Sequence, residues 1–185
     1  MVLSLAVGMQ DKTDSTLLFV AQAADIRADN LDIVCEFVLE GKQLAYGTAK
    51  KGYCAIINNF ITIGAGAQTP LLQKAIESGG YFFRQYALVD NGEFVSNKPK
   101  NKFIRRAIAV KNEQVIMVQS IGIESFHDFT QALIDFGVRD AIYLVGSNAY
   151  GWYYDREKQK HEFGKERENL PANVSYIVWR AKLKR

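Results

Sequence analysis

Residues 120–155, SIGIESFHDFTQALIDFGVRDAIYLVGSNAYGWYYD, contain the signals that decide the fold. Ser125 is a suitable N-cap for a helix, and Gly137 predicts where that helix ends. Between them, the apolar residues at helical spacing are Phe129, Ala132, Leu133 and Phe136. The apolar run 141–145 then predicts a buried strand that opens into the polar, small-residue loop 146–151. A buried strand that ends in such a loop is a common way to build a binding or catalytic site.

Strand-like runs dominate the rest of the chain, and several are joined by hairpin signals. The predicted strands are residues 2–7, 16–23, 32–39, 42–48, 53–57, 61–63, 81–89, 93–95, 103–110, 114–119 and 174–183. Thr69 and Pro70 predict the start of a second helix over 70–78. Residues 50–52 predict a turn, whereas 23–29 fit either a short helical turn or an irregular connection. These patterns predict an α+β fold in a single domain (1–185), a mixed strand-rich sheet with two main helices.

Composition excludes several classes of protein. The chain has 185 residues, of which 48% are hydrophobic and 23% charged, as in ordinary globular domains. A net charge of +3 is too small to indicate nucleic-acid binding, and the basic tail (Arg180, Lys182, Lys184, Arg185) is interpreted as a solvated terminus. No stretch approaches the roughly 20 apolar residues of a membrane span. Residues 1–9 are too short for a signal peptide, so the chain fits either a cytoplasmic protein or an exported or envelope protein whose signal was trimmed.

The sequence predicts neither a metal nor a cofactor. Cys35 and Cys54 lie in apolar segments without zinc-ligand spacing, and buried free thiols are expected unless export allows a single disulfide. The two histidines, His127 and His161, have no partner implied by their spacing. The glycines at 64 and 66 precede a helix, but the third glycine of a dinucleotide-binding motif is absent.

Three arginines of the predicted strands are candidate functional residues: Arg84, Arg105 and Arg106. Arg84 lies between aromatic residues, where it either covers apolar surface at a sheet rim or holds an anion such as phosphate. Arg105 and Arg106 are adjacent, so their side chains point to opposite faces of the strand. We therefore expect one to reach solvent and the other to need an anionic partner, since an unpaired buried charge is costly.

The order of these features resembles the phosphodiester glycosidase family over residues 53–155. The resemblance is carried by AIINNF (55–60), GYFF (80–83), RRAIAV (105–110), QVIMV (114–118) and SFHDFTQALIDFGVRDAIYLVG (125–146). It implies that family's fold and its reaction, which cleaves the bond between a sugar's anomeric carbon and a phosphodiester oxygen.

The resemblance also implies roles for particular residues. Arg105 would hold the phosphate as a catalytic residue, with Arg84 as a second anion contact. Asp155, or alternatively Glu124, would be the general acid, because glycoside hydrolysis normally needs a carboxyl group. The expected substrate-binding residues are Asn58, Asn59, Ser147 and Asn148, with Arg84. These side chains are expected to share one hollow at the end of strand 141–145.

Two substitutions leave the activity open. Val145 stands where the family has an aspartate in its active-site loop, and Arg106 replaces the family's threonine. Val145 has no group to accept a proton, bind a metal or hold a sugar hydroxyl. The sequence therefore predicts a diverged phosphodiester glycosidase-like protein that hydrolyses or binds sugar-1-phosphate diesters. The alternative is a non-catalytic carbohydrate-binding or envelope-interaction module on the same fold, with a glycan as its partner.

Overall fold

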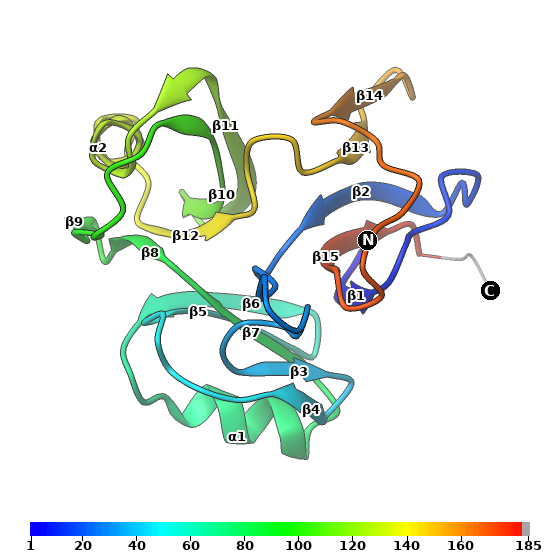
Figure 1. Ribbon diagram of the computed structural model, residues 1–185, viewed down its shortest axis with the longest axis horizontal. Helices are drawn as coiled ribbons and strands as arrows, with labels where there is room; N and C mark the ends of the chain where they lie inside the picture. Colours follow the sequence, from blue (N-terminus) through cyan, green and yellow to red (C-terminus); the bar gives the residue numbers. More distant parts are fainter. Residues whose placement is uncertain (183–185) are drawn as a thin grey trace.

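Fifteen β-strands and two α-helices make up residues 1–182, the part of the chain that the computed structural model describes (Figure 1). The strands form three five-stranded sheets, and every pairing between these strands is antiparallel. The prediction of a strand-rich α+β fold with two helices is confirmed. The predicted final strand ended at Leu183, which lies outside the described residues, as do Lys184 and Arg185 of the tail.

The first sheet combines strands from both ends of the chain. In spatial order it contains β1 (Val2–Val7), β15 (Ser175–Arg180), β2 (Leu17–Gln22), β13 (Gly151–Tyr154) and β14 (Lys160–Phe163). The hairpin of β13 and β14 was missed by the sequence analysis. Alternating charged residues hide it, and only Trp152 of this hairpin is a deeply buried large side chain.

The second sheet carries the segment that decides the fold. Its spatial order is β11 (Gln114–Glu124), β10 (Phe103–Lys111), β12 (Asp140–Leu144), β8 (Ala87–Asp90) and β9 (Glu93–Phe94). Helix α2 (Phe126–Asp135) connects β11 to β12, but β10 lies between these two strands. The prediction of a mixed sheet is therefore wrong, because the crossover through α2 does not join neighbouring strands.

The third sheet contains the arginine-bearing strand β7. Its spatial order is β4 (Lys42–Ala45), β3 (Phe37–Leu39), β7 (Tyr81–Gln85), β5 (Gly52–Ile57) and β6 (Phe60–Ala65), and helix α1 (Pro70–Glu77) packs on it. The predicted strand 81–89 is divided at Tyr86, where the chain passes from this sheet to β8 of the second. Figure 1 shows this crossing in green, between the lower sheet and the upper left of the molecule.

Both helices begin where their caps predict. The Thr69 hydroxyl accepts a hydrogen bond from the Leu71 amide, and the Ser125 hydroxyl accepts one from the Asp128 amide (3.0 Å). In α2, Phe129 and Leu133 are buried as expected, but Ala132 and Phe136 are exposed. Phe126 and Thr130 complete the buried face instead. The buried stripe therefore begins about one turn earlier than predicted and runs through residues 126, 129, 130 and 133.

The three sheets share one central core, to which each contributes one face. Along β10, Ile108 and Val110 point into this core, whereas Ala107 and Ala109 face α2. Cys35 and Cys54 are both buried free thiols, as predicted, and burial raises the pKa of Cys54. Within residues 1–182, no helix has the length and apolar character that crossing a membrane requires.

Candidate functional site

A cavity of about 680 Å³ lies at the end of β12, next to the loop 145–150. Ser147 and Asn148 line it, as the sequence analysis expected of this loop. Its other walls come from residues 22–34, which follow β2, and from residues 165–174, which precede β15. The strand end is therefore open to a ligand of small to moderate size.

Backbone hydrogen bonds hold these three segments together. The Val145 amide donates to the Gln22 carbonyl (3.1 Å), and the Lys165 amide donates to the Asn148 carbonyl (3.0 Å). Ser147 donates to the Ile104 carbonyl (2.8 Å) while adopting a left-handed conformation with φ of 52°. Left-handed conformations are strained for residues other than glycine, and they cluster at functional sites.

Arg106 fixes the cavity loop from below. Its guanidinium donates to the carbonyls of Val145 (2.9 Å) and Ala149 (3.1 Å) and to the Gln119 side chain (2.8 Å), and it lies 4.2 Å from the Phe163 ring centre. The side chain is fully buried, and burial lowers the pKa of Arg106 to about 10, so it stays charged at neutral pH. No carboxylate of the described residues pairs with it, contrary to the expectation of an anionic partner.

A buried lysine forms part of the cavity wall. The Lys50 ammonium forms an ion pair with Asp25, donates to the Gln85 side-chain oxygen (2.7 Å) and lies 4.6 Å from the Tyr86 ring centre. Lys50 is only 7% exposed, although the sequence predicted a turn there. The side-chain nitrogen of Gln85 is buried without a hydrogen-bond partner among the described residues. Unpaired buried donors are rare in folded proteins, but Gln85 does not itself line the cavity and acts there only through Lys50.

Tyr150 lines the cavity and carries a buried hydroxyl. The polar neighbour of this hydroxyl is the Glu162 carboxylate. Burial and the nearby Glu162 carboxylate raise the pKa of Tyr150, so the phenol stays neutral. A neutral hydroxyl both donates and accepts hydrogen bonds.

Arg105 points away from this cavity, onto the face of β10 that carries α2. Its guanidinium donates to the carbonyls of Glu124 (2.9 Å) and Asn101, and its centre lies 3.9 Å from the Phe126 ring centre. Arg105 is 2% exposed. We expected one arginine of the pair to reach solvent, but both are buried. Side chains alternate between the two faces of a strand, so Arg105 points to the face opposite that of Arg106 and away from the β12-end cavity.

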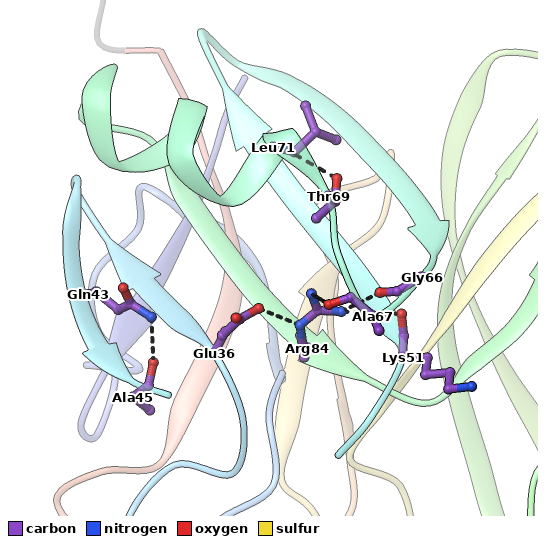
Figure 2. A network of polar contacts seen from close by, with 9 residues as sticks. All are labelled: Glu36, Gln43, Ala45, Lys51, Gly66, Ala67, Thr69, Leu71 and Arg84. Carbon is purple, nitrogen blue, oxygen red and sulfur yellow. Dashed lines mark hydrogen bonds and ion pairs between the residues drawn. The ribbon is translucent and has the colours of Figure 1, made fainter. Parts of the chain in front are cut away.

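Arg84 uses its side chain for contacts within and beside the third sheet (Figure 2). Its side chain pairs with Glu36 (2.5 Å) and donates to the carbonyls of Gly66 (2.7 Å) and Ala67 (2.9 Å), as the dashed lines of Figure 2 show. The side chain is 1% exposed. Of the two interpretations made from the sequence, these contacts favour a structural role over anion binding.

Asn58 and Asn59 form the turn between β5 and β6. Both have positive φ (50° and 65°), which asparagine tolerates better than most residues and which a tight hairpin turn requires. The Asn59 side-chain oxygen accepts a hydrogen bond from the Leu3 amide (2.8 Å), so it joins this hairpin to β1. Neither residue lines the cavity at the end of β12.

Asp155 lies at the end of β13, beside a different cavity. Its carboxylate is hydrogen-bonded to the His161 ring nitrogen (2.7 Å), which lowers the pKa of Asp155. His161 therefore has a partner that its spacing did not suggest, because the hairpin that joins them was not predicted.

The predicted site residues thus do not converge on one hollow. Ser147 and Asn148 line the β12-end cavity, whereas the other five lie elsewhere: Arg105, Asp155, Asn58, Asn59 and Arg84. The catalytic and substrate-binding roles given to these five remain predictions. The charged residues that do line the cavity were missed: Asp25, Lys50, Lys165 and Arg167. The sequence indicates only turns and connections in the segments that carry these residues. The tertiary structure brings them together at the end of β12.

Gly164 packs closely against the cavity loop, and substituting it tests the importance of this contact. It has φ of 75°, and a Cβ there would overlap the Ala149 carbonyl of the cavity loop. We expect Gly164→Ala to lower the free energy of unfolding by about 1–3 kcal/mol, because a strained φ is combined with a steric clash. Urea denaturation followed by circular dichroism measures this change.

Gly92→Ala is the matched control, since Gly92 has a similar φ of 81° but open space around the added Cβ. It carries only the cost of the left-handed conformation, about 1 kcal/mol. Equal losses in the two variants would show that the contact with Ala149 does not matter.

Comparisons with known proteins show the fold and not the function. No family model matches the sequence, and no curated protein matches it. Among solved structures, the catalytic domain of zebrafish N-acetylglucosamine-1-phosphodiester alpha-N-acetylglucosaminidase, auto-inhibited by its pro-peptide, is similar with a TM-score of 0.69 and 11% identity. The similarity covers 98% of this chain and 73% of that one.

A hypothetical protein from Synechocystis is also similar, with a TM-score of 0.56 and 12% identity, over 96% of this chain and 57% of that one. At such low identity these similarities support a phosphodiester glycosidase-like fold only distantly. They leave activity and ligand to be argued from the site itself.

Proposed function

We propose that this protein binds sugar-1-phosphate diesters in the cavity at the end of β12. The observation that carries the proposal is the charge of the lining. Three cationic side chains (Lys50, Lys165, Arg167) face one carboxylate, that of Asp25, which leaves a net charge of +2 around about 680 Å³. A phosphodiester carries a single negative charge, so the cavity matches it in sign and in size.

The remaining lining suits the sugar. Ser147 and Asn148 supply a hydroxyl and an amide, which both donate and accept hydrogen bonds from sugar hydroxyls. Tyr150, which also lines the cavity, adds an aromatic ring against which a sugar can lie. The similar zebrafish enzyme acts, by its name, on an N-acetylglucosamine-1-phosphodiester.

Binding without turnover is the form of the proposal that the carboxylates favour. Glycoside hydrolysis usually needs two carboxyl groups, one on each side of the scissile bond. Asp25 is the one carboxylate of the described residues that lines this cavity, and its charge is taken up by Lys50. Val145, in place of the family's aspartate, supports the same conclusion.

The test uses purified protein with two probes, a methyl diester of N-acetylglucosamine-1-phosphate and uridine diphosphate N-acetylglucosamine. Calorimetry measures binding, and chromatography measures released sugar. We expect saturable binding and no release. Lys165→Ala/Arg167→Ala should weaken binding at least tenfold, because it removes both exposed cations of the cavity rim.

Lys98→Ala/Lys100→Ala removes the same charge from an exposed loop that does not line the cavity, and it should leave binding unchanged. Equal weakening of binding in both double variants would show that the ligand is held only by the general positive charge of the protein. The proposed site would then be wrong. Sugar release that Arg105→Ala or Asp155→Ala abolishes would support the catalytic roles predicted from the sequence instead.

A further inference from the structure

A second and larger cavity, of about 1390 Å³, lies between the first sheet and β11. The strands β2, β13 and β15 contribute one wall, and the start of β11 contributes the other. It is separate from the β12-end cavity, since the two share no lining residue. The proposed phosphodiester site does not use it, although Asp155, for which the sequence predicts a catalytic role, is among its lining residues.

Aromatic side chains form a row across this wall. The strand register places His161 opposite Tyr153, Tyr153 opposite Phe19, and Phe19 opposite Trp179. These residues lie on four neighbouring strands and share one face of the sheet. Phe19, Tyr153 and Trp179 line the cavity and, with neighbouring strands about 4.8 Å apart, span about 10 Å, whereas His161 continues the row outside the lining. Phe19 is only 8% exposed, so Tyr153 and Trp179 are the more accessible rings of the row. We refer to these four residues as the aromatic row.

The rings of the aromatic row are held in place by contacts with one another. Tyr153 and His161 are stacked, with centroids 4.9 Å apart and planes 18° apart, and Asp155 fixes the His161 ring by a hydrogen bond. Phe19 and Trp179 make an edge contact at 4.6 Å. Tyr153 remains 38% exposed although it lines the cavity, so its ring is ordered and accessible.

Polar groups border the apolar wall. Gln114 and Ser15 line the cavity together with Asp155, Arg156 and Lys158. Neutral sugars are recognised by this combination, because their C–H faces lie against aromatic rings while their hydroxyls bond to polar groups at the edge. Single-stranded nucleic acid also stacks on aromatic rows, but it needs several cations along its backbone. Two cations and one carboxylate at one end do not supply them.

We propose that this cavity is a binding site for a neutral oligosaccharide, which lies along the aromatic row with Tyr153 as its principal contact. The length of the row favours a chain of several sugars over a single sugar. The site is independent of the phosphodiester site, and each proposal stands if the other fails.

Tryptophan fluorescence gives a selective signal for this site. The chain has two tryptophans, and Trp152 is buried on the opposite face of the same sheet, whereas Trp179 lines the cavity. In a Trp152→Phe variant, the emission therefore reports on Trp179 alone. We would titrate this variant with hexasaccharides of glucose, N-acetylglucosamine, xylose and mannose, and expect a saturable change with at least one of them.

Tyr153→Ala in the same background should weaken that binding at least tenfold. Tyr46→Ala, which removes a tyrosine that is 75% exposed and does not line the cavity, should not. Lys165→Ala/Arg167→Ala should also leave oligosaccharide binding intact, which separates the two sites. Urea denaturation confirms that each variant is folded. The proposal is overturned if none of the hexasaccharides changes the emission, if Tyr153→Ala binds as tightly as its parent, or if single-stranded polynucleotide alone binds in a Tyr153-dependent manner.

Discussion

Glu36→Gln is expected to lower the free energy of unfolding by about 3 kcal/mol, one of the two largest changes that any single substitution here should cause. Glu36 is the only carboxylate of the described residues in contact with Arg84, whose side chain is 1% exposed. Removing its charge leaves a buried guanidinium without compensation, which costs far more than the loss of an exposed ion pair. Urea denaturation at neutral pH measures the change.

The double variant Arg84→Met/Glu36→Gln shows whether the loss belongs to the pair. It should lose less stability than the two single variants together, because no uncompensated charge remains. It should not recover fully, since the carbonyls of Gly66 and Ala67 lose their donors. Asp29→Asn, in an exposed ion pair with Arg27, should cause no measurable change. Strictly additive losses in the double variant would mean that Glu36 and Arg84 act independently.

Arg106→Met should destabilise the protein by a similar amount, about 3 kcal/mol, and should also loosen the cavity loop. Three acceptors, from Gln119, Val145 and Ala149, lose a charged donor at once. Methionine fills much of the volume but donates no hydrogen bond. Urea denaturation gives the stability, and hydrogen exchange of the amides of residues 145–149 reports on the loop.

Arg106→Lys separates charge from geometry. Lysine keeps the positive charge but lacks the planar fork that reaches several acceptors, so it should show most of the loss. Arg27→Met removes an exposed arginine and should have no measurable effect. A lysine variant as stable as the parent, with unchanged exchange in the loop, would show that the charge alone holds this part of the structure.

Local signals predicted much of the fold. The helix caps at Thr69 and Ser125 lie where the sequence places them, because each depends on residues close in sequence. For the same reason, the turns at 40–41 and 90–92 lie in the gaps between predicted strands. The division of residues 81–90 between two sheets was not predicted, since an apolar strand looks the same whichever sheet it joins. The adjacent asparagines Asn58 and Asn59 are typical of a tight turn, but the sequence analysis interpreted them as sugar contacts instead.

The site was less predictable than the fold. The loop after residue 145 was expected to form part of a hollow, and Ser147 and Asn148 do line one. The family resemblance indicated Arg105 as the arginine of the hollow, but neither arginine lines it, and Arg106 is the one that contacts the loop. Which of the two points toward the loop depends on the register of β10. The lining residues Lys50 and Lys165 come from connecting segments more than 100 residues apart in the sequence. No local sequence pattern predicts that two such distant segments lie side by side.

The pairing of β1 with β15 has a consequence for how the protein is made. Residues 2–7 are synthesised well before residues 175–180, yet in the described structure they pair only with Ser175–Arg180. Until residues 175–180 have been synthesised, this apolar segment has no native strand to pair with. Its backbone donors and acceptors are open to pairing with other chains during that time.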